Sequence, residues 1–217
     1  MIDVNHQINA VRRSIGSRVL EAGEARTLTI SQAYEADLDD VWDACTNIER
    51  IPRWFLPVSG ELRLGGRYQF EGQAGGTIER CDPPKSFAAT WEYGGQTSWI
   101  EVRLTPEEDG RTRFELEHIA HVDDQMWEQY GPGAVGIGWD QGIIGLALHL
   151  SGAPAVDPAE GAAWQLSEEG VAFAKLSSER WRDASIEAGT DPAAATAAAD
   201  RVTAFYTTPP EEGAPES

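Results

Sequence analysis

The chain is poor in cysteine, with only Cys45 and Cys81 among its 217 residues. Two cysteines cannot form a disulfide scaffold or a four-cysteine zinc site. Cys45 shares a predicted helical face with apolar neighbours, which favours an inert buried thiol. His118 and His121 are three residues apart on a predicted strand, so their side chains face opposite sides. We therefore expect two reduced, partly buried thiols and no metal site.

Long apolar runs are also absent. No stretch reaches the roughly 18 consecutive apolar residues of a membrane-spanning helix. The first residues, MIDVNHQINAVRR, lack the apolar core that follows the charges of a signal peptide. These absences predict a cytoplasmic protein without a membrane span.

Positive charge is scarce, because 17 basic residues stand against 36 acidic ones and the formal net charge is −19. Nucleic acid carries the same sign of charge, so we expect no nucleic-acid partner. The acidity is more typical of a solvated surface that keeps a protein soluble. The chain also lacks a Gly-x-Ser-x-Gly nucleophile motif and a phosphate-binding loop with its lysine, and we expect no cofactor.

The strongest positive signal is an apolar segment at residues 136–150, GIGWDQGIIGLALHL. Its larger apolar side chains recur at spacings of four and three, which predicts an α-helix with one wide covered face: Val135, Trp139, Ile143, Leu146 and Leu150. Glycine inside a helix costs about 1 kcal/mol relative to alanine. The four glycines of this segment therefore predict either close approach of another surface or open space beside the helix.

Upstream of that helix the apolar period is two. Residues 26–34 form a predicted strand, and residues 37–46 form a helix capped by Asp37, with a second short helix at 48–51. Residues 56–121 alternate between apolar and polar positions, with glycine or proline turns between the runs. This pattern predicts consecutive antiparallel hairpins with one covered and one wet face.

The two ends of the chain are less regular. Residues 1–25 fit either a helix with Val4, Ile8 and Val11 on one face or a strand from Ile15 onward. Residues 122–135 are a predicted loop and residues 152–161 a predicted linker. Helices are predicted at 168–188 and from Asp191 to about residue 206, with a polar disordered tail at 208–217.

The order of these elements resembles a known superfamily. The residues that carry the likeness are Asp37, Val41, Trp42, Ala44, Trp54, Asp82-Pro83-Pro84, Trp91 and Gly138-Trp139. The chain resembles the SRPBCC (START-like) superfamily over residues 26–151, and within it the branch homologous to the activator of the ninety-kilodalton heat-shock-protein ATPase. Residues 152–207 look like a helical extension seen in actinobacterial members. The expected organisation is thus an N-terminal segment (1–25), a START-like domain (26–151), the extension (152–207) and the tail (208–217).

The resemblance implies an α+β helix-grip fold, in which a seven-stranded antiparallel sheet wraps around a long helix. It often implies an apolar cavity between sheet and helix, but it does not imply one function. Members include lipid and polyketide binders, cyclases, hydrolases and cochaperone domains, and no catalytic motif spans these activities.

The candidate ligand-binding residues lie on the predicted covered faces: Trp54, Phe70, Trp91, Phe114, His118 and Trp139. Binding sites for small molecules are mostly apolar with few polar groups, which fits this set. Ordinary core packing is the alternative for each aromatic residue, Tyr68 and Tyr93 included. His118 could also be a core histidine whose hydrogen bonds are satisfied by the protein.

The candidate catalytic residues are His118 and Glu79, since an imidazole or a desolvated carboxylate can act as a general acid or base. Glu101 alternates with Ile100 and Val102, which predicts the outer face. We expect Asp140 to sit favourably near the start of the central helix.

Three functions follow from these observations. The leading one is binding of an apolar or aromatic small molecule between sheet and helix. The alternatives are a cyclase- or hydrolase-type enzyme that uses the same cavity, and a cochaperone-like interaction module. Trp99 and Trp127 face outward in the predicted pattern and could mark a homodimer interface.

Overall fold

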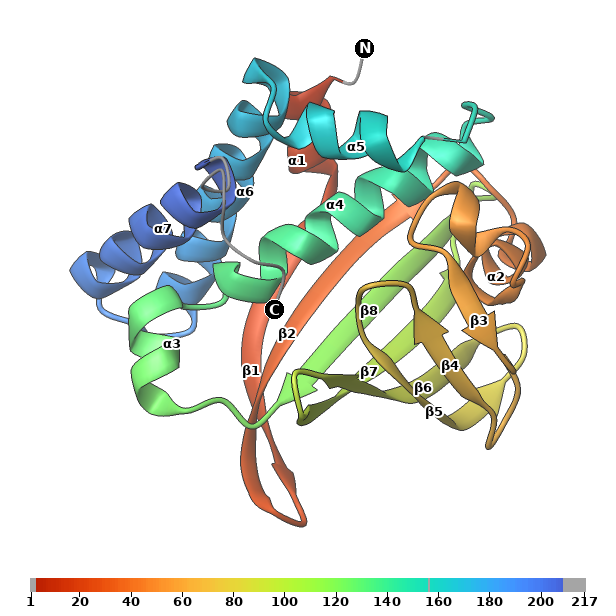
Figure 1. The fold of residues 1–217 in the computed structure, drawn as a ribbon, viewed down its shortest axis with the longest axis horizontal. Helices are drawn as coiled ribbons and strands as arrows, with labels where there is room; N and C mark the ends of the chain where they lie inside the picture. The colour runs from red at the N-terminus through yellow and green to blue at the C-terminus, as the bar shows by residue number, and fades with distance from the viewer. Residues whose placement is uncertain (1–2, 156, 209–217) are drawn as a thin grey trace.

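The computed structural model describes residues 3–155 and 157–208. The predicted disordered tail therefore lies, apart from Thr208, outside the described residues. Within the described part, one antiparallel sheet of eight strands wraps around a long helix (Figure 1). This is the helix-grip arrangement, so the predicted fold class is confirmed.

The sheet runs in the order β1-β2-β8-β7-β6-β5-β4-β3, so β2 and β8 pair although they lie far apart in the chain, and every other pair is a hairpin. Its strands are β1 (Arg12–Leu20), β2 (Gly23–Tyr34), β3 (Val58–Gly60), β4 (Arg67–Phe70), β5 (Gly75–Asp82), β6 (Ser86–Tyr93), β7 (Gln96–Pro106) and β8 (Thr112–Ala120).

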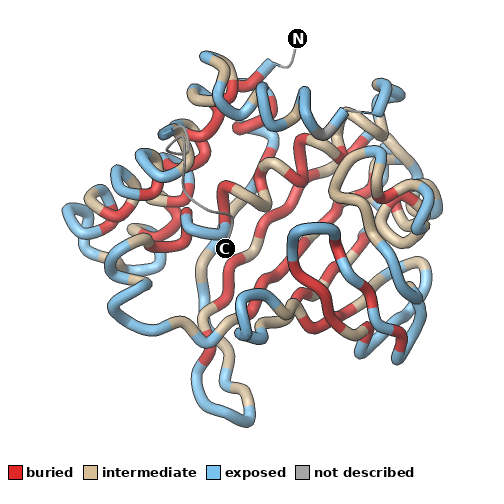
Figure 2. The backbone as a smooth tube through the Cα atoms, in the orientation of Figure 1, coloured by how far each residue is buried: buried red, intermediate tan, exposed pale blue. Residues whose placement is uncertain are grey.

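The described sheet has one strand more than the seven that the resemblance implies. The additional strand is β1, which pairs with β2 over its whole length and brings the N-terminal segment into the sheet. Both alternatives for residues 1–25 are realised in succession, because the helix α1 (Val4–Ala10) precedes β1. The tip of the β1–β2 hairpin projects into solvent (Figure 2).

The helices cover one face and one end of the sheet (Figure 1). After α1 they are α2 (Leu38–Thr46), α3 (Asp124–Tyr130), α4 (Gly133–Leu150), α5 (Pro158–Gln165), α6 (Glu168–Glu187) and α7 (Pro192–Thr207). The central helix α4 lies across the sheet, with buried positions along it (Figure 2). Asp37 and Asp191 cap α2 and α7 as predicted: Asp37 accepts from the backbone N–H of Asp40, and Asp191 from those of Ala193 and Ala194.

Several local expectations were wrong. The short helix at 48–51 is instead a 3-10 turn, η1 (Ile51–Arg53), with Pro52 inside it. The predicted loop at 122–135 contains α3, and the predicted linker contains the start of α5. Asp123 caps α3, and Arg201 of α7 donates to the backbone oxygen of Gln129 at 2.7 Å. Because α3 presents no regular apolar stripe and depends on this contact with α7, periodicity could not reveal it.

Two glycines of α4 explain how neighbouring elements approach so closely. A Cβ atom at position 145 would overlap the backbone oxygen of Trp54, and one at position 136 would overlap the indole ring of Trp181. Both contacts require glycine, as the cost of glycine in this helix predicts. Val135 is the exception to the predicted buried face, because the first turn of α4 leaves it exposed.

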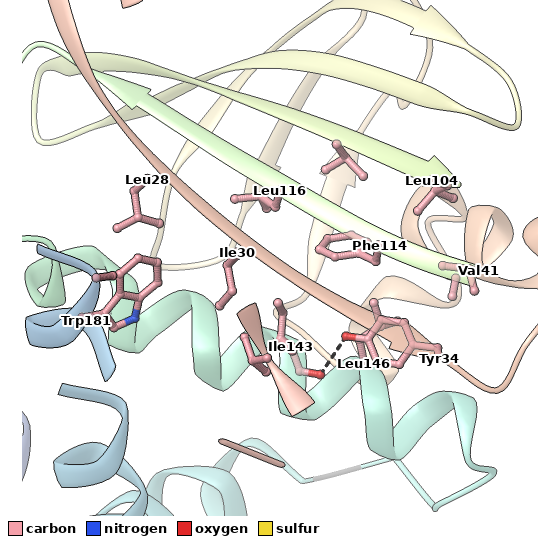
Figure 3. Packing of buried hydrophobic residues seen from close by; sticks show 14 residues of the cluster. Leu28, Ile30, Tyr34, Val41, Leu104, Phe114, Leu116, Ile143, Leu146 and Trp181 are labelled. Carbon is pink, nitrogen blue, oxygen red and sulfur yellow. Dashed lines mark hydrogen bonds between the residues drawn. The ribbon is translucent and has the colours of Figure 1, made fainter. Parts of the chain in front are cut away.

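The main core lies between α4 and strands β2, β7 and β8 (Figure 3). Ile30 and Leu116 pack from the sheet toward Ile143 and Leu146 of the helix. The hydroxyl of Tyr34 donates to the backbone oxygen of Ile143 at 3.2 Å, which joins β2 to the middle of α4. Burial, together with nearby acidic groups, raises the pKa of this hydroxyl well above its ordinary value, so it remains a donor.

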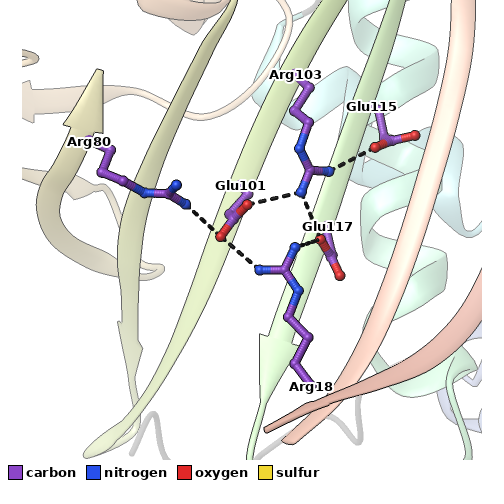
Figure 4. A network of polar contacts seen from close by, with 6 residues as sticks. All are labelled: Arg18, Arg80, Glu101, Arg103, Glu115 and Glu117. Carbon is purple, nitrogen blue, oxygen red and sulfur yellow. Dashed lines mark hydrogen bonds and ion pairs between the residues drawn. The ribbon is translucent and has the colours of Figure 1, made fainter. Parts of the chain in front are cut away.

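The outer face of the sheet carries a network of ion pairs (Figure 4). Glu101 accepts from Arg18, Arg80 and Arg103, and Glu117 accepts from Arg18 and Arg103. Partial burial acts to raise the pKa of Glu101, but the arginines outweigh it and hold that pKa below its ordinary value. Glu101 thus lies on the outer face, as its alternation predicts, and takes part in sheet packing.

Asp140 of α4 is the centre of a buried polar cluster. Arg13 of β1 donates to both of its carboxylate oxygens, at 3.1 and 2.7 Å, and the two side chains are only 3% and 2% exposed. From α6, the hydroxyl of Ser177 and the indole N–H of Trp181 both donate to Oδ2 of Asp140, at 2.5 and 2.9 Å. One carboxylate therefore joins the N-terminal strand, the central helix and the C-terminal extension. The predicted place of Asp140 near the start of the helix is wrong, because α4 begins at Gly133 and Asp140 lies in its interior.

Replacing Asp140 by alanine should lower the free energy of unfolding by about 3–5 kcal/mol, because Arg13 is left charged and buried without its partner. Urea unfolding followed by circular dichroism measures this loss. The matched control is Asp124→Ala, which breaks a pair with an 85% exposed acid and should cost less than about 1 kcal/mol. Equal losses in the two variants would contradict the assigned role of Asp140.

Candidate functional site

A pocket of about 490 Å³ lies between the sheet and α4, bounded at one end by α2 and the turn at residues 51–55. Its volume falls within the roughly 300–1,000 Å³ of small-molecule sites. Strands β4 to β8 supply one wall, and Trp139, Gly142, Ile143 and Leu146 of α4 supply the other. Most lining side chains are aromatic or aliphatic, as expected for a site that holds an apolar ligand.

Five of the six predicted ligand-binding residues meet at this pocket: Trp54, Phe70, Trp91, Phe114 and Trp139. They come from the turn after α2, from β4, β6 and β8, and from α4. His118 is buried, is not among the lining residues and accepts a hydrogen bond from Trp139. Glu79 is exposed on β5 and does not line the pocket.

The aromatic side chains form a continuous set around the void. The rings of Phe55 and Trp139 are nearly parallel, with centroids 6.5 Å apart. The ring centroid of Trp91 lies 5.0 Å from that of Trp139 and 5.8 Å from that of Phe70. Phe55 and Phe70 pack edge-to-face, with ring centroids 5.0 Å apart. Such offset and edge-to-face pairs are the favoured arrangements of aromatic rings. These ring contacts fix the positions of the aromatic side chains that line the pocket.

His118 connects two of these tryptophans through hydrogen bonds. The indole N–H of Trp139 donates to Nδ1 of His118 at 3.0 Å, and Nε2 of His118 lies 2.8 Å from Oγ of Ser98. The Ser98 hydroxyl donates in turn to the backbone oxygen of Trp91 at 3.1 Å. Because an indole nitrogen can only donate, the neutral imidazole must carry its proton on Nε2 and donate to Ser98.

This arrangement gives His118 a positioning role. Both ring nitrogens are engaged, so neither is free to accept a proton from a molecule in the pocket. Burial lowers the pKa of His118 to about 4, which keeps the ring neutral at physiological pH. His118 thus matches the alternative of a hydrogen-bonded core histidine, and its effect on the pocket runs through Trp139 and Trp91.

Two further polar groups of the wall, on Trp54 and Tyr68, also have acceptors within the protein. The indole N–H of Trp54 donates to the backbone oxygen of Ala44 at 2.9 Å, and the Tyr68 hydroxyl donates to that of Thr90 at 2.6 Å. Burial raises the pKa of the Cys45 thiol to about 12, so it stays protonated, as expected for an inert thiol. The described part of the chain contains no group of three His, Cys, Asp or Glu residues that could hold a metal ion.

Sequence reasoning missed several residues of the pocket edge, among them Arg63, Leu64, Cys81 and Pro83. The register of β5 shifts between Ile78 and Arg80, and this irregularity lets both Ile78 and Cys81 line the pocket. Cys81 is nevertheless exposed, so the expectation of two partly buried thiols is wrong for this residue. Leu62, Arg63 and Leu64 belong to a segment predicted as an alternating strand, but they lie in the loop between β3 and β4. Tyr93, expected on the covered face, is 58% exposed because it ends β6 beside the hairpin turn.

Comparison with known proteins agrees with this geometry. The profile of the Activator of Hsp90 ATPase homolog 1-like protein family matches residues 35–150. The chain belongs to this family. Its members commonly bind hydrophobic ligands, or are cochaperones or polyketide-cyclase-like proteins. A comparison with curated sequences gives no significant match.

Solved structures add a relative within the family. CalU16 from Micromonospora echinospora is 35% identical in its crystal structure, with a TM-score of 0.65 over 81% of this chain and 98% of CalU16. Its solution structure is 36% identical, with a TM-score of 0.67 over 83% and 97% of the two chains. An HSP90 activator from Plasmodium falciparum, PFC0360w, is 17% identical, covers 59% of this chain and 97% of its own, and has a TM-score of 0.50, which shows the fold alone. The predicted resemblance is therefore confirmed, and CalU16 supports the actinobacterial type.

The pH dependence of stability tests the role of His118 in this family member. Its pKa is about 6.5 in an unfolded chain and about 4 in the folded protein, so between these values only the unfolded state binds the proton. As the pH drops below about 6.5, His118 should therefore lower the free energy of unfolding of the wild type by about 1.4 kcal/mol per pH unit.

The variant His118→Phe should lose this part of the slope, measured by urea unfolding at several pH values between about 6.5 and 5. His118→Gln serves as a second variant if the first does not fold. The control His121→Gln, at an exposed histidine, should keep the wild-type slope. A wild-type slope that survives in both His118 variants would rule out the assignment.

Proposed function

We propose that this protein binds an apolar or aromatic small molecule in the pocket between α4 and the sheet. The observation that carries the proposal is an open volume of about 490 Å³ with a largely aromatic and aliphatic wall, in which the N–H groups of Trp54 and Trp139 and the hydroxyl of Tyr68 are hydrogen-bonded within the protein. Binding an apolar molecule against such a wall removes apolar surface from water, which is favourable by about 25 cal/mol for each Å² buried. Trp54, Phe70, Trp91, Phe114 and Trp139 are the proposed contact residues.

The geometry supports binding better than catalysis. A general acid or base must be able to exchange a proton with the bound molecule. His118 has both nitrogens engaged, and Glu79 lies outside the pocket. The cochaperone alternative rests on membership of a family that includes cochaperones, and the likeness to PFC0360w adds the fold alone.

A homodimer remains a prediction. Trp99 and Trp127, which were expected to face outward at its interface, do not support it. Trp99 is half-buried and meets His121 edge-on, and Trp127 lies against the guanidinium of Arg26 at 4.7 Å. Each therefore already has a partner within the chain.

The test is titration of the folded protein with fatty acids, flavonoids and polyketide-like aromatics, followed by tryptophan fluorescence and by calorimetry. A ligand in this pocket should alter the emission of Trp91 or Trp139 and bind with a negative heat-capacity change. The filled-pocket variant Ala89→Leu should bind at least about tenfold more weakly, because its side chain takes up ligand space.

Two controls keep this test specific. Ala193→Leu makes the same chemical change at an exposed site on α7 and should bind as the wild type does. Trp91→Phe and Trp139→Phe report which indole senses the ligand. Failure of every ligand class to bind a folded protein, or unchanged binding by Ala89→Leu, would refute the proposal.

A further inference from the structure

The edge of the pocket differs in chemistry from its interior. Leu62, Arg63 and Leu64 lie in the loop between β3 and β4, and all three line the pocket. Leu64 is 59% exposed, so an apolar side chain stands partly in water where the pocket opens. The side chain of Arg63 is 70% exposed at the same place. This loop therefore forms an opening at which a bound molecule can meet solvent.

The interior disfavours polar groups on a ligand. The N–H groups of Trp54 and Trp139 and the hydroxyl of Tyr68 each have an acceptor within the protein. A ligand hydroxyl or carboxylate placed among them would lose its hydrogen bonds to water without replacement, which costs roughly 1–3 kcal/mol for a neutral group and more for a charged one. Among the described lining residues a charged partner lies only at the opening, so we place the charged group of a ligand there.

Arg63 is the one charged residue among those lining the described pocket, and it is positive in a chain with a net charge of −19. Its described partner is Glu61, whose carboxylate accepts from Nη2 at 2.5 Å. Both side chains are mostly exposed, so this pair contributes little to stability. The contacts described for Arg63 leave Nε and Nη1 to donate to a second acceptor, and a guanidinium suits a carboxylate in a two-bond arrangement.

We propose that the ligand is an amphipathic carboxylic acid: an apolar or aromatic body fills the pocket and its carboxylate pairs with Arg63 at the opening. This inference rests on the proposed function and names the class of molecule that the same pocket takes. Leu62 and Leu64, on either side of Arg63, cover the part of the apolar body nearest the opening.

Matched pairs of probes test the inference. Dodecanoic acid is compared with 1-dodecanol, and 2-naphthoic acid with 2-naphthalenemethanol, each titrated by calorimetry into wild type, Arg63→Gln and Arg67→Gln. Arg67 is the matched control, because it is similarly exposed, pairs with Glu92 and does not line the pocket. Wild type should bind one or both acids about five- to tenfold more tightly than the corresponding alcohol.

In Arg63→Gln the affinity for the acids should fall by that same factor, while the affinity for the alcohols stays unchanged. Arg63→Lys should keep part of the affinity for the acids. The preference for acids should shrink as salt is added. Alcohols that bind as well as the acids to wild type would overturn the carboxylate assignment and leave the proposed function standing. An equal loss in Arg67→Gln would overturn it too, by showing a general charge effect. Failure of all four probes to bind would count against both proposals.

Discussion

The buried carboxylate of Asp140 is the constraint on which the rest of the structure depends. Two buried charges are tolerable only when they are paired and hydrogen-bonded, and Asp140 meets this demand through Arg13, Ser177 and Trp181. These partners come from β1 and α6, so they hold α4 at a defined rotation about its own axis. Because neighbouring residues of a helix point about 100° apart, this rotation turns Trp139 toward the pocket.

The same cluster explains why the C-terminal helices are part of the domain's packing. The family profile ends at residue 150, but Trp181 of α6 is fully buried against the glycine at position 136 of α4. The extension thus supplies half of the hydrogen bonds to Asp140 from outside the matched region. CalU16 aligns with 81% of this chain, more than the profile covers.

Ring packing and hydrogen bonds connect the residues of the pocket wall to one another. His118, Ser98 and the tryptophans on either side form an ordered series of hydrogen bonds, and the aromatic rings brace one another around the void. Charge appears only at the opening, on Arg63. In the proposed complex, the pocket therefore selects a ligand by the apolar surface of the part that enters it.

The sequence alone determined the central helix, the caps Asp37 and Asp191 and five of the aromatic residues around the pocket, because hydrophobic periodicity and capping are local signals. The helix-grip fold followed from the order of these elements together with the family resemblance. It could not show that β1 joins the sheet or that α3 forms, since both depend on partners distant in the chain. Arg13 and Asp140 are 127 positions apart, and no spacing rule connects them. The role of His118 and the inward turn of Cys81 were likewise decided only by tertiary structure. Alternation says which face a residue takes, whereas its hydrogen-bond partners and a shift of register depend on the packed neighbours.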